Sequence, residues 1–194
     1  MVDDLIYQDE PWNELINGNL VKMSPRPSTD HNIVVGNIFR IFGNYLDGSR
    51  CTPFAAGSDL FLTEQDRFIP GGMIVCDTDK IKPDGIHGAP DLVVEVLSPS
   101  TVKNDRGHKK DVYEASGVKE YWIVDTASRS IEVHLLKDGK FDLDNVYSVY
   151  PDFLLRKMTE EERSQIINEF HPSEFLEMTV SLVAVFAGLI EGGK

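Results

Sequence analysis

The sequence predicts an α/β (α+β) fold, in which a mixed central sheet is flanked by helices. Short β-branched runs alternate with segments of helical periodicity. The chain has 194 residues, of which 41% are hydrophobic, and this is enough to bury one full core. A single domain over residues 1–194 is therefore expected. Its C-terminal part, 151–194, carries the weakest patterns.

The first predicted element is a hairpin. Residues 3–23 read as a lead-in followed by two short apolar pairs, which flank Asn17-Gly18. Asn-Gly between such pairs is typical of a two-residue hairpin turn. Glu14 lies just before this turn.

A helix is predicted next. Pro25 and Pro27 mark a loop, after which Ser28 or Thr29 can cap the helix. Its apolar stripe would pack on the sheet, and Gly48 would end it. His31 falls in its first turn, a position that is more often a surface residue than a catalyst.

Residues 51–76 are predicted to form strands. A turn near Gln65 and Asp66 would pair the two runs 59–62 and 68–76 as a hairpin, and Asp59 would then lie opposite Gly71-Gly72. Residues 77–90 read as a polar loop without regular structure.

The run from Asp91 to Leu97 (DLVVEVL) predicts a buried strand, and Glu95 is its anomaly. Pleating puts Asp91, Val93, Glu95 and Leu97 on one face, and Leu92, Val94 and Val96 on the other. Burying a carboxylate without a charged partner costs on the order of several kcal/mol. Glu95 is therefore a candidate functional residue, and a structural ion pair is the alternative.

A helix over residues 105–116 follows, with Asn104 or Asp105 as its cap and Gly117 as its end. Asp105, Lys109 and Tyr113 recur every four residues and so share one face. By itself the Asp105–Lys109 pair is typical of an exposed helix surface. It gains interest because Lys109 can reach back to Glu95.

The remaining patterns alternate between strands and helices. Strands are predicted over 120–125, 130–136 and 141–150, joined by hairpins. Thr159 and Glu162 have the spacing of a capping box, which predicts a helix to about Phe170. Residues 181–186 read as a final helix, or as a strand followed by a helix.

Charge and cysteine content narrow the function classes. The chain has 32 acidic and 19 basic residues, a formal net charge of −13, which opposes binding to DNA phosphates. No apolar run is long enough to cross a membrane, and no signal peptide is evident. Cys51 and Cys76 lack metal-ligand spacing, so reduced thiols and a cytoplasmic location are expected.

Three segments together resemble a known family. They are GAPDLVVEVLSPST, the D-x-x-x-K-x-x-x-Y pattern that begins at Asp105, and GVKEYWIVD from Gly117; ELINGNLVKMSPRPSTDH adds a fourth likeness. Over about residues 10–136 the chain is similar to the Uma-two-type restriction endonuclease family of the PD-(D/E)XK nuclease superfamily. The resemblance implies a restriction-endonuclease-like fold and a Mg²⁺-dependent (or Mn²⁺-dependent) DNA endonuclease that can form a homodimer.

The resemblance also implies a set of site residues. Glu95 would be the strand Glu that holds metal, Glu14 a second ligand, and Lys109 a lysine displaced from the strand position that Leu97 fills here. His31, Asp105 and Tyr113 match positions that the family commonly fills alike. Carboxylates suit Mg²⁺, which lowers the pKa of bound water, and a lysine stabilises the charge that develops on a phosphate.

One position departs from the family pattern: the expected Pro-Asp reads Pro70-Gly71, so one anionic ligand is missing. Asp91 lies four residues from Glu95, about 13 Å along a strand, too far to share an ion. Asp59, predicted across the hairpin from Gly72, is a candidate replacement. Two hypotheses stay open: a Mg²⁺-dependent phosphodiesterase, and a catalytically inactive nuclease-fold module for binding or oligomerisation.

Overall fold

A computed structural model of the protein describes residues 13–23 and 26–190. In that part of the chain, six strands form a central sheet in the order β12-β11-β10-β9-β6-β3. Its strands are β3 (Thr52–Ala55), β6 (Gly72–Val75), β9 (Leu92–Val96), β10 (Glu120–Asp125), β11 (Ser130–Lys137) and β12 (Lys140–Ser148). β9 and β10 are parallel and the other neighbours are antiparallel, which confirms the predicted mixed sheet. The predicted lead-in at residues 3–12 lies outside the described residues.

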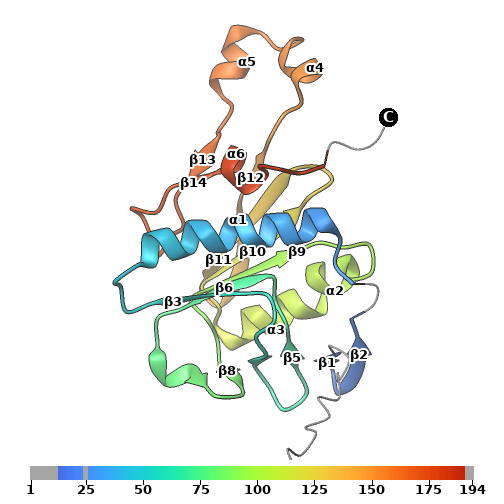
Figure 1. Ribbon diagram of the computed structural model, residues 1–194, viewed down its shortest axis with the longest axis vertical. Helices are drawn as coiled ribbons and strands as arrows, with labels where there is room; N and C mark the ends of the chain where they lie inside the picture. The colour runs from blue at the N-terminus through green and yellow to red at the C-terminus, as the bar shows by residue number, and fades with distance from the viewer. Residues whose placement is uncertain (1–12, 24–25, 191–194) are drawn as a thin grey trace, which may run out of the picture.

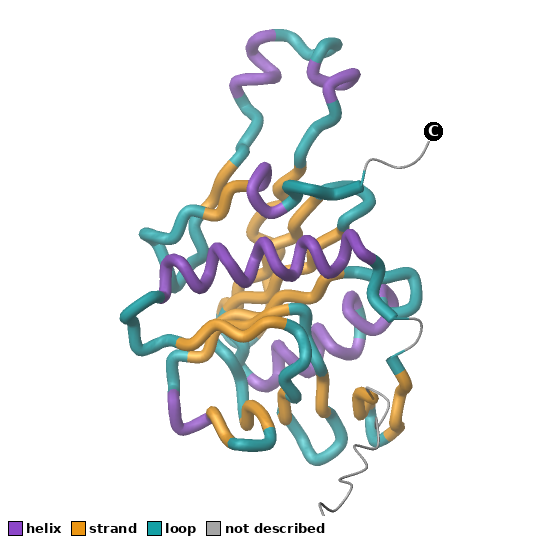
Figure 2. Tube along the Cα trace, viewed as in Figure 1, coloured by secondary structure: helices purple, strands orange, loops and turns teal. Residues whose placement is uncertain are grey.

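Helices cover both faces of this sheet (Figure 1). The long helix α1 (Thr29–Leu46) crosses one face, and its cap is Ser28, whose hydroxyl accepts from the backbone N–H of His31. The short helices α2 (Val102–Arg106) and α3 (His108–Ser116) lie on the opposite face (Figure 2). The predicted arrangement, a central sheet flanked by helices, is therefore confirmed.

The prediction of one helix over 105–116 was wrong, because the chain breaks at Gly107. Neither Asn104 nor Asp105 caps a helix: both lie inside α2, which starts at Val102. A Cβ at Gly107 would lie 2.8 Å from the carbonyl oxygen of Lys103, so only glycine fits between the two helices. Gly117 ends α3 in a left-handed conformation, as predicted.

A second, smaller sheet lies beside α3, and in the described residues its order is β2-β1-β5-β4-β8-β7. Its strands are β1 (Asn13–Ile16), β2 (Asn19–Lys22), β4 (Leu60–Phe61), β5 (Arg67–Phe68), β7 (Ile81–Lys82) and β8 (Gly85–His87). Asn17 and Gly18 both have positive φ, which confirms the predicted β1–β2 turn. The 77–90 segment was wrongly predicted to lack regular structure, since it contains β7, β8 and the 3₁₀ turn Thr78–Lys80.

The predicted pairing of Asp59 with Gly71-Gly72 was also wrong. Leu60 faces Phe68 in the β4–β5 hairpin, whereas Gly72 faces Ala55 on β3 and Val94 on β9. The chain crosses from one sheet to the other between β5 and β6. A hairpin pattern read along the sequence cannot reveal such a crossing.

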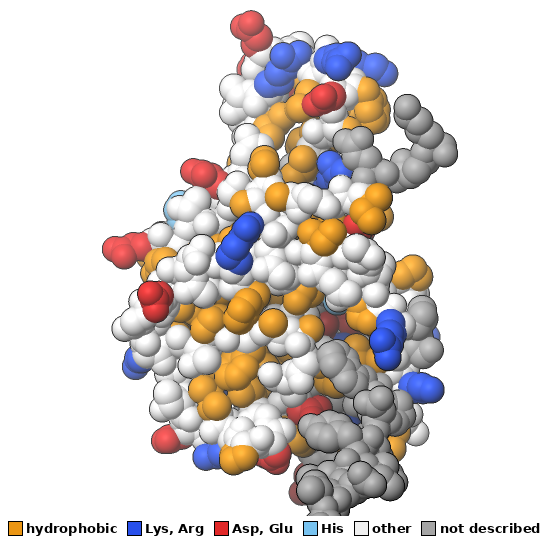
Figure 3. Space-filling model, viewed as in Figure 1, with side chains coloured by type: hydrophobic (Ala, Val, Ile, Leu, Met, Phe, Trp, Pro, Cys, Tyr) orange, Lys and Arg blue, Asp and Glu red, His pale blue; other side chains and the backbone are white. Residues whose placement is uncertain are grey.

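The C-terminal part forms an arm and a small β-ribbon. In Figure 1 the arm stands away from the central sheet, and in Figure 3 Lys and Arg side chains gather near its end. Its elements are α4 (Asp152–Leu155), α5 (Glu160–Ser164), β13 (Glu169–Phe170), β14 (Val180–Ser181) and α6 (Leu182–Val185). The capping box at Thr159 is present, but the helix ends at Ser164 and not near Phe170. The strand-then-helix alternative for 181–186 is confirmed.

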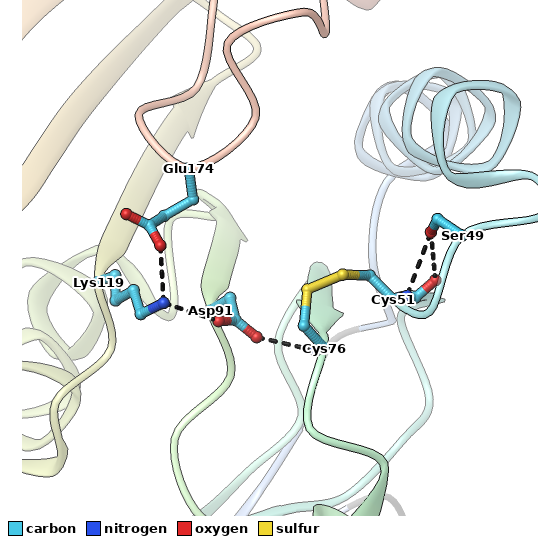
Figure 4. The surroundings of a disulfide bond; sticks show 6 residues. All are labelled: Ser49, Cys51, Cys76, Asp91, Lys119 and Glu174. Atoms are coloured by element: carbon cyan, nitrogen blue, oxygen red, sulfur yellow. Dashed lines mark hydrogen bonds and ion pairs between the residues drawn. A yellow bond between two sulfur atoms is a disulfide. The ribbon is translucent and has the colours of Figure 1, made fainter.

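The expectation of reduced cysteines was wrong. Cys51 and Cys76 form a disulfide across the ends of β3 and β6 (Figure 4). They come together because Thr52 and Val75 are paired in the antiparallel ladder. Cys51, which precedes Thr52, therefore lies opposite Cys76, which follows Val75. Asp91 accepts from the backbone N–H of Cys76 and pairs with Lys119, as expected of a strand-entry residue. No helix among the described residues is long and apolar enough to span a membrane.

Candidate active site

The centre of the candidate site is the ammonium group of Lys109, which three carboxylates surround. Its Nζ lies 2.7 Å from Glu14 Oε1, 3.1 Å from Glu95 Oε1 and 3.3 Å from Asp105 Oδ1. All four side chains are buried. The Asp105–Lys109 pair is therefore not the exposed helix pair that the sequence alone allowed.

Four separate elements hold these side chains in place. Glu14 comes from β1 and accepts a hydrogen bond from the backbone N–H of Ile69, at 2.9 Å. Glu95 stands in the middle of β9, and Tyr113 on α3 donates its hydroxyl to Glu95 Oε1 at 2.7 Å. The helix break at Gly107 leaves Asp105 and Lys109 on consecutive short helices. Tyr121, on β10, secures α2 by donating to the carbonyl of Asp105.

Electrostatics in this cluster favour uptake of a proton. Burial raises the pKa of Glu95 to about 8; the ammonium of Lys109 opposes this, while the Asp105 and Glu14 carboxylates add to it. Burial likewise raises the pKa of Asp105. Burial alone would favour a neutral Lys109, but the three carboxylates outweigh it and raise the pKa of Lys109. Glu95 therefore keeps a proton to higher pH than an ordinary glutamate, beside a charged lysine.

A cavity of about 290 Å³ lies beside the cluster, and Glu95 and Lys109 are among its buried lining residues. His31 from α1 and Gly71 before β6 also line it, as does the segment 97–101 that follows β9. His31 Nδ1 is buried without a hydrogen-bond partner, and burial lowers the pKa of this imidazole. His31 is thus neutral at neutral pH.

The structure brings together most of the residues that the sequence singled out. Glu14, Glu95, Asp105 and Lys109 share the cluster, and His31 lines the same cavity. Asp59 is the exception: its carboxylate pairs with Arg67 at 3.6 Å, and it does not line the cavity. The hairpin register that placed it near the metal does not exist.

Three hydroxyl groups at the cavity were missed by sequence reasoning. Ser98 Oγ lies 3.1 Å from Ser100 Oγ and 3.0 Å from Thr101 Oγ1, and all three residues line the cavity. The signal was present as Ser-Pro-Ser-Thr directly after the strand that carries Glu95. By its composition alone, this run predicts only the connection to the next helix.

The side chains of the cluster are of the kind that binds a divalent cation, but their arrangement is not that of a metal site. Carboxylate oxygens are the ligands of Mg²⁺, three acids face one ammonium, and neither buried oxygen of Asp105 accepts a hydrogen bond. However, Lys109 bridges Glu14 and Glu95, and Gly71 has no side-chain oxygen to offer. Within residues 13–23 and 26–190, no group of three His, Cys, Asp or Glu side chains is arranged to hold a metal ion.

Gly71 is also closely packed. A Cβ there would lie 3.2 Å from the carbonyl oxygen of Val94 and 3.3 Å from Cγ2 of Val96. Any side chain at this position must shift β9 or its neighbours by a few tenths of an ångström.

Fold and cluster together define a restriction-endonuclease-like domain with a buried acid–lysine centre. The chain belongs to the Uma2 family, described as "Putative restriction endonuclease", whose model matches residues 3–155. The fold is similar to that of a protein from Anabaena variabilis titled as a putative nuclease belonging to DUF820, with a TM-score of 0.67 and 17% identity over 92% of this chain and 91% of that one.

A further relative is the uncharacterized protein slr1290 of Synechocystis sp., which is 32% identical over 115 residues. The match covers 57% of this chain and 60% of that relative, so the two share only part of their lengths.

Proposed function

We propose that the chain is a Mg²⁺-dependent (or Mn²⁺-dependent) nuclease of the PD-(D/E)XK type that hydrolyses phosphodiester bonds in DNA. The observation that carries the proposal is the buried Glu95–Lys109–Glu14 cluster, of which Glu95 and Lys109 line the cavity. A strand acid, an early acid and a helix lysine are the parts that the family resemblance requires, and they meet here although they lie far apart in sequence.

Each residue has a distinct role in this proposal. Lys109 is charged, lines the cavity and stabilises negative charge on a phosphate oxygen there. Tyr113 and Asp105 position Glu95 and Lys109, because each contacts one of them directly. Neutral His31 lines the cavity and can exchange a proton with water or with the leaving group.

Glu95 and Glu14 would hold the cation. When bound, Mg²⁺ supplies Lewis-acid stabilisation and lowers the pKa of a bound water. Both carboxylates are already desolvated, so a cation would compete with the proton on Glu95 and with the ammonium of Lys109.

A second function is favoured by Gly71. The absence of a carboxylate there, together with a Lys109 ammonium that already bridges the acids, matches a nuclease fold that has lost catalysis and serves as a binding or oligomerising module. In that case the cluster would be a structural ion-pair network.

Nicking of supercoiled plasmid, with Mg²⁺, with Mn²⁺ and with chelator, tests the first function against the second. The native chain should nick only with metal, and Glu95→Gln should lower the rate by about 100-fold or more, as loss of a charge-stabilising group does. Glu174→Gln, at a surface ion pair with Lys119, is the matched control and should keep the native rate. Equal nicking by the native chain and Glu95→Gln would exclude the proposed mechanism, and no nicking by any form would favour the module.

A further inference from the structure

The cavity beside Glu95 is small, and hydroxyl and apolar side chains line it. At about 290 Å³ it stands at the lower end of the range for ligand pockets, roughly 300–1,000 Å³. Its lining includes the hydroxyl residues Ser98, Ser100 and Thr101 and the imidazole of His31. These groups can all hydrogen-bond to phosphate oxygens.

Other parts of the wall are apolar. Met23, Pro27, Ile69, Leu97 and Pro99 line the cavity, in contrast to the hydroxyl groups. Enzymes that take a base out of a duplex hold it between aromatic or apolar side chains in a pocket of this kind. A cavity lined by both hydroxyl and apolar side chains suits a ligand that carries both a phosphate and a base.

The charge around the cavity argues against a duplex. Among the described residues that line it, only Arg26 and Lys109 carry a basic side chain, and Lys109 is neutralised by three carboxylates. The whole chain has a formal net charge of −13. Proteins that bind duplex DNA neutralise many phosphates with Lys and Arg, and this cavity can neutralise one or two.

We propose, on the basis of the nuclease function above, that the site takes a single unpaired nucleotide unit, at the end of a strand or in single-stranded DNA, and not the interior of a duplex. The phosphate contacts Arg26, His31 and the Ser98–Thr101 hydroxyls, and the base contacts the apolar wall. Its phosphodiester then lies next to Lys109 and Glu95.

Binding in chelator, where cleavage cannot occur, tests this proposal by fluorescence anisotropy. The ligands are a short single strand labelled at one end, the blunt duplex of the same sequence, and that duplex with an unpaired tail. The single strand and the tailed duplex should bind at least about 10-fold more tightly than the blunt duplex. The slope of log K against log salt should be about −0.7 for each contacted phosphate, hence near −0.7 to −1.4.

Variants locate the binding. Arg26→Gln and Ser98→Ala should each weaken single-strand binding several-fold, whereas Lys103→Gln should not. Lys103 is an exposed cation on α2 that does not line the cavity, which makes it the matched control. A nucleoside monophosphate competitor distinguishes a free nucleotide from a nucleotide within a strand. If the monophosphate displaces the labelled strand as well as an equal concentration of unlabelled strand does, the ligand is the free nucleotide. If only the unlabelled strand displaces it, the ligand is the unpaired part of a strand.

Equal or tighter binding of the blunt duplex, a much steeper salt slope, no binding of any ligand, or equal effects of the Arg26 and Lys103 variants would each overturn the proposal. Its failure differs from failure of the nuclease function. Glu95-dependent nicking with no preference for unpaired DNA rejects only the substrate class, and preferential single-strand binding without nicking rejects only catalysis.

Discussion

The two faces of strand β9 have the same burial and opposite chemistry. Leu92, Val94 and Val96 point toward α1 into an apolar core. Its edge holds one buried acid of the neighbouring strand β10, Glu120, which accepts hydrogen bonds from Trp122 and Ser173. Val93 and Glu95 point toward α3, where the acid–lysine cluster interrupts the second core. Adjacent residues of one strand therefore belong to a face built for packing and a face that carries charge.

The difference between the two faces of β9 indicates which of them carries the function. Burying three carboxylates and one ammonium costs desolvation energy that an apolar core would avoid, and such a cluster can be less stabilising than its hydrophobic replacement. A fold needs only the apolar face to hold helix and sheet together. The charged face, which opens to the cavity, is the one whose cost needs a functional explanation.

The largest expected effect is on the charged face, with Lys109→Met. This change removes the cation that the three carboxylates share and should lower the free energy of unfolding by about 3–5 kcal/mol. Urea denaturation at neutral pH measures it. Lys110→Met, at the next position of α3, is the control and should cost less than about 1 kcal/mol. If the two variants are equally stable, Lys109 does not hold the cluster together.

On the apolar face, Val94→Ala should lower the free energy of unfolding by about 2–3 kcal/mol, through lost burial and the cavity left behind. The loss should be the same at pH 5 and at pH 8, because the core residues packed in this cluster are apolar and the hydrogen bonds of Glu120 go to Trp122 and Ser173 and not to Val94. A loss that changes with pH would show that the two faces are coupled.

The pH dependence of stability should come from the charged face. Glu95 is protonated up to a pKa of about 8 in the folded protein but loses its proton near 4.5 when unfolded. Between these values the folded state binds more protons, so the free energy of unfolding falls as pH rises, by at most about 1.4 kcal/mol per pH unit. Glu95→Gln should make this slope shallower, as measured by denaturation from pH 5 to 8, and the remainder belongs to Asp105 and Glu120, whose pKa values burial also raises. An unchanged slope would assign the proton to another group.

The smallest effect is expected at Gly71. Gly71→Ala should cost about 1 kcal/mol, because the new Cβ crowds the backbone of β9. Gly71→Asp adds the same Cβ and a carboxylate, so the difference between the two variants isolates the missing ligand. Calorimetry should find tighter Mg²⁺ binding by Gly71→Asp than by Gly71→Ala. Equal binding would mean that position 71 does not face the cation site.

Local patterns predicted much of this fold. The β9 alternation, the turn at Asn17-Gly18, the cap at Ser28 and the left-handed end at Gly117 each depend on a few neighbouring residues, and the structure confirms them. Glu95 was recognisable because a carboxylate in an apolar strand is costly wherever that strand packs.

What the sequence concealed was long-range pairing. The Cys51–Cys76 bond and the position of Asp59 both depend on which strands become neighbours, and the chain leaves one sheet for the other between Phe68 and Gly72. The break at Gly107 depends on a contact with a carbonyl of the preceding turn, which no periodicity displays. The meeting of Glu14 with Lys109 followed from the family resemblance and not from spacing.

The central claim is that the carboxyl group of Glu95 exchanges its proton for a divalent cation when one binds. Calorimetric titration of Mg²⁺ or Mn²⁺ into the protein at pH 7, in two buffers of different ionisation enthalpy, measures that exchange. The account predicts binding with release of up to one proton per ion, and loss of that release in Glu95→Gln. Absence of binding, or binding without proton release, would contradict it.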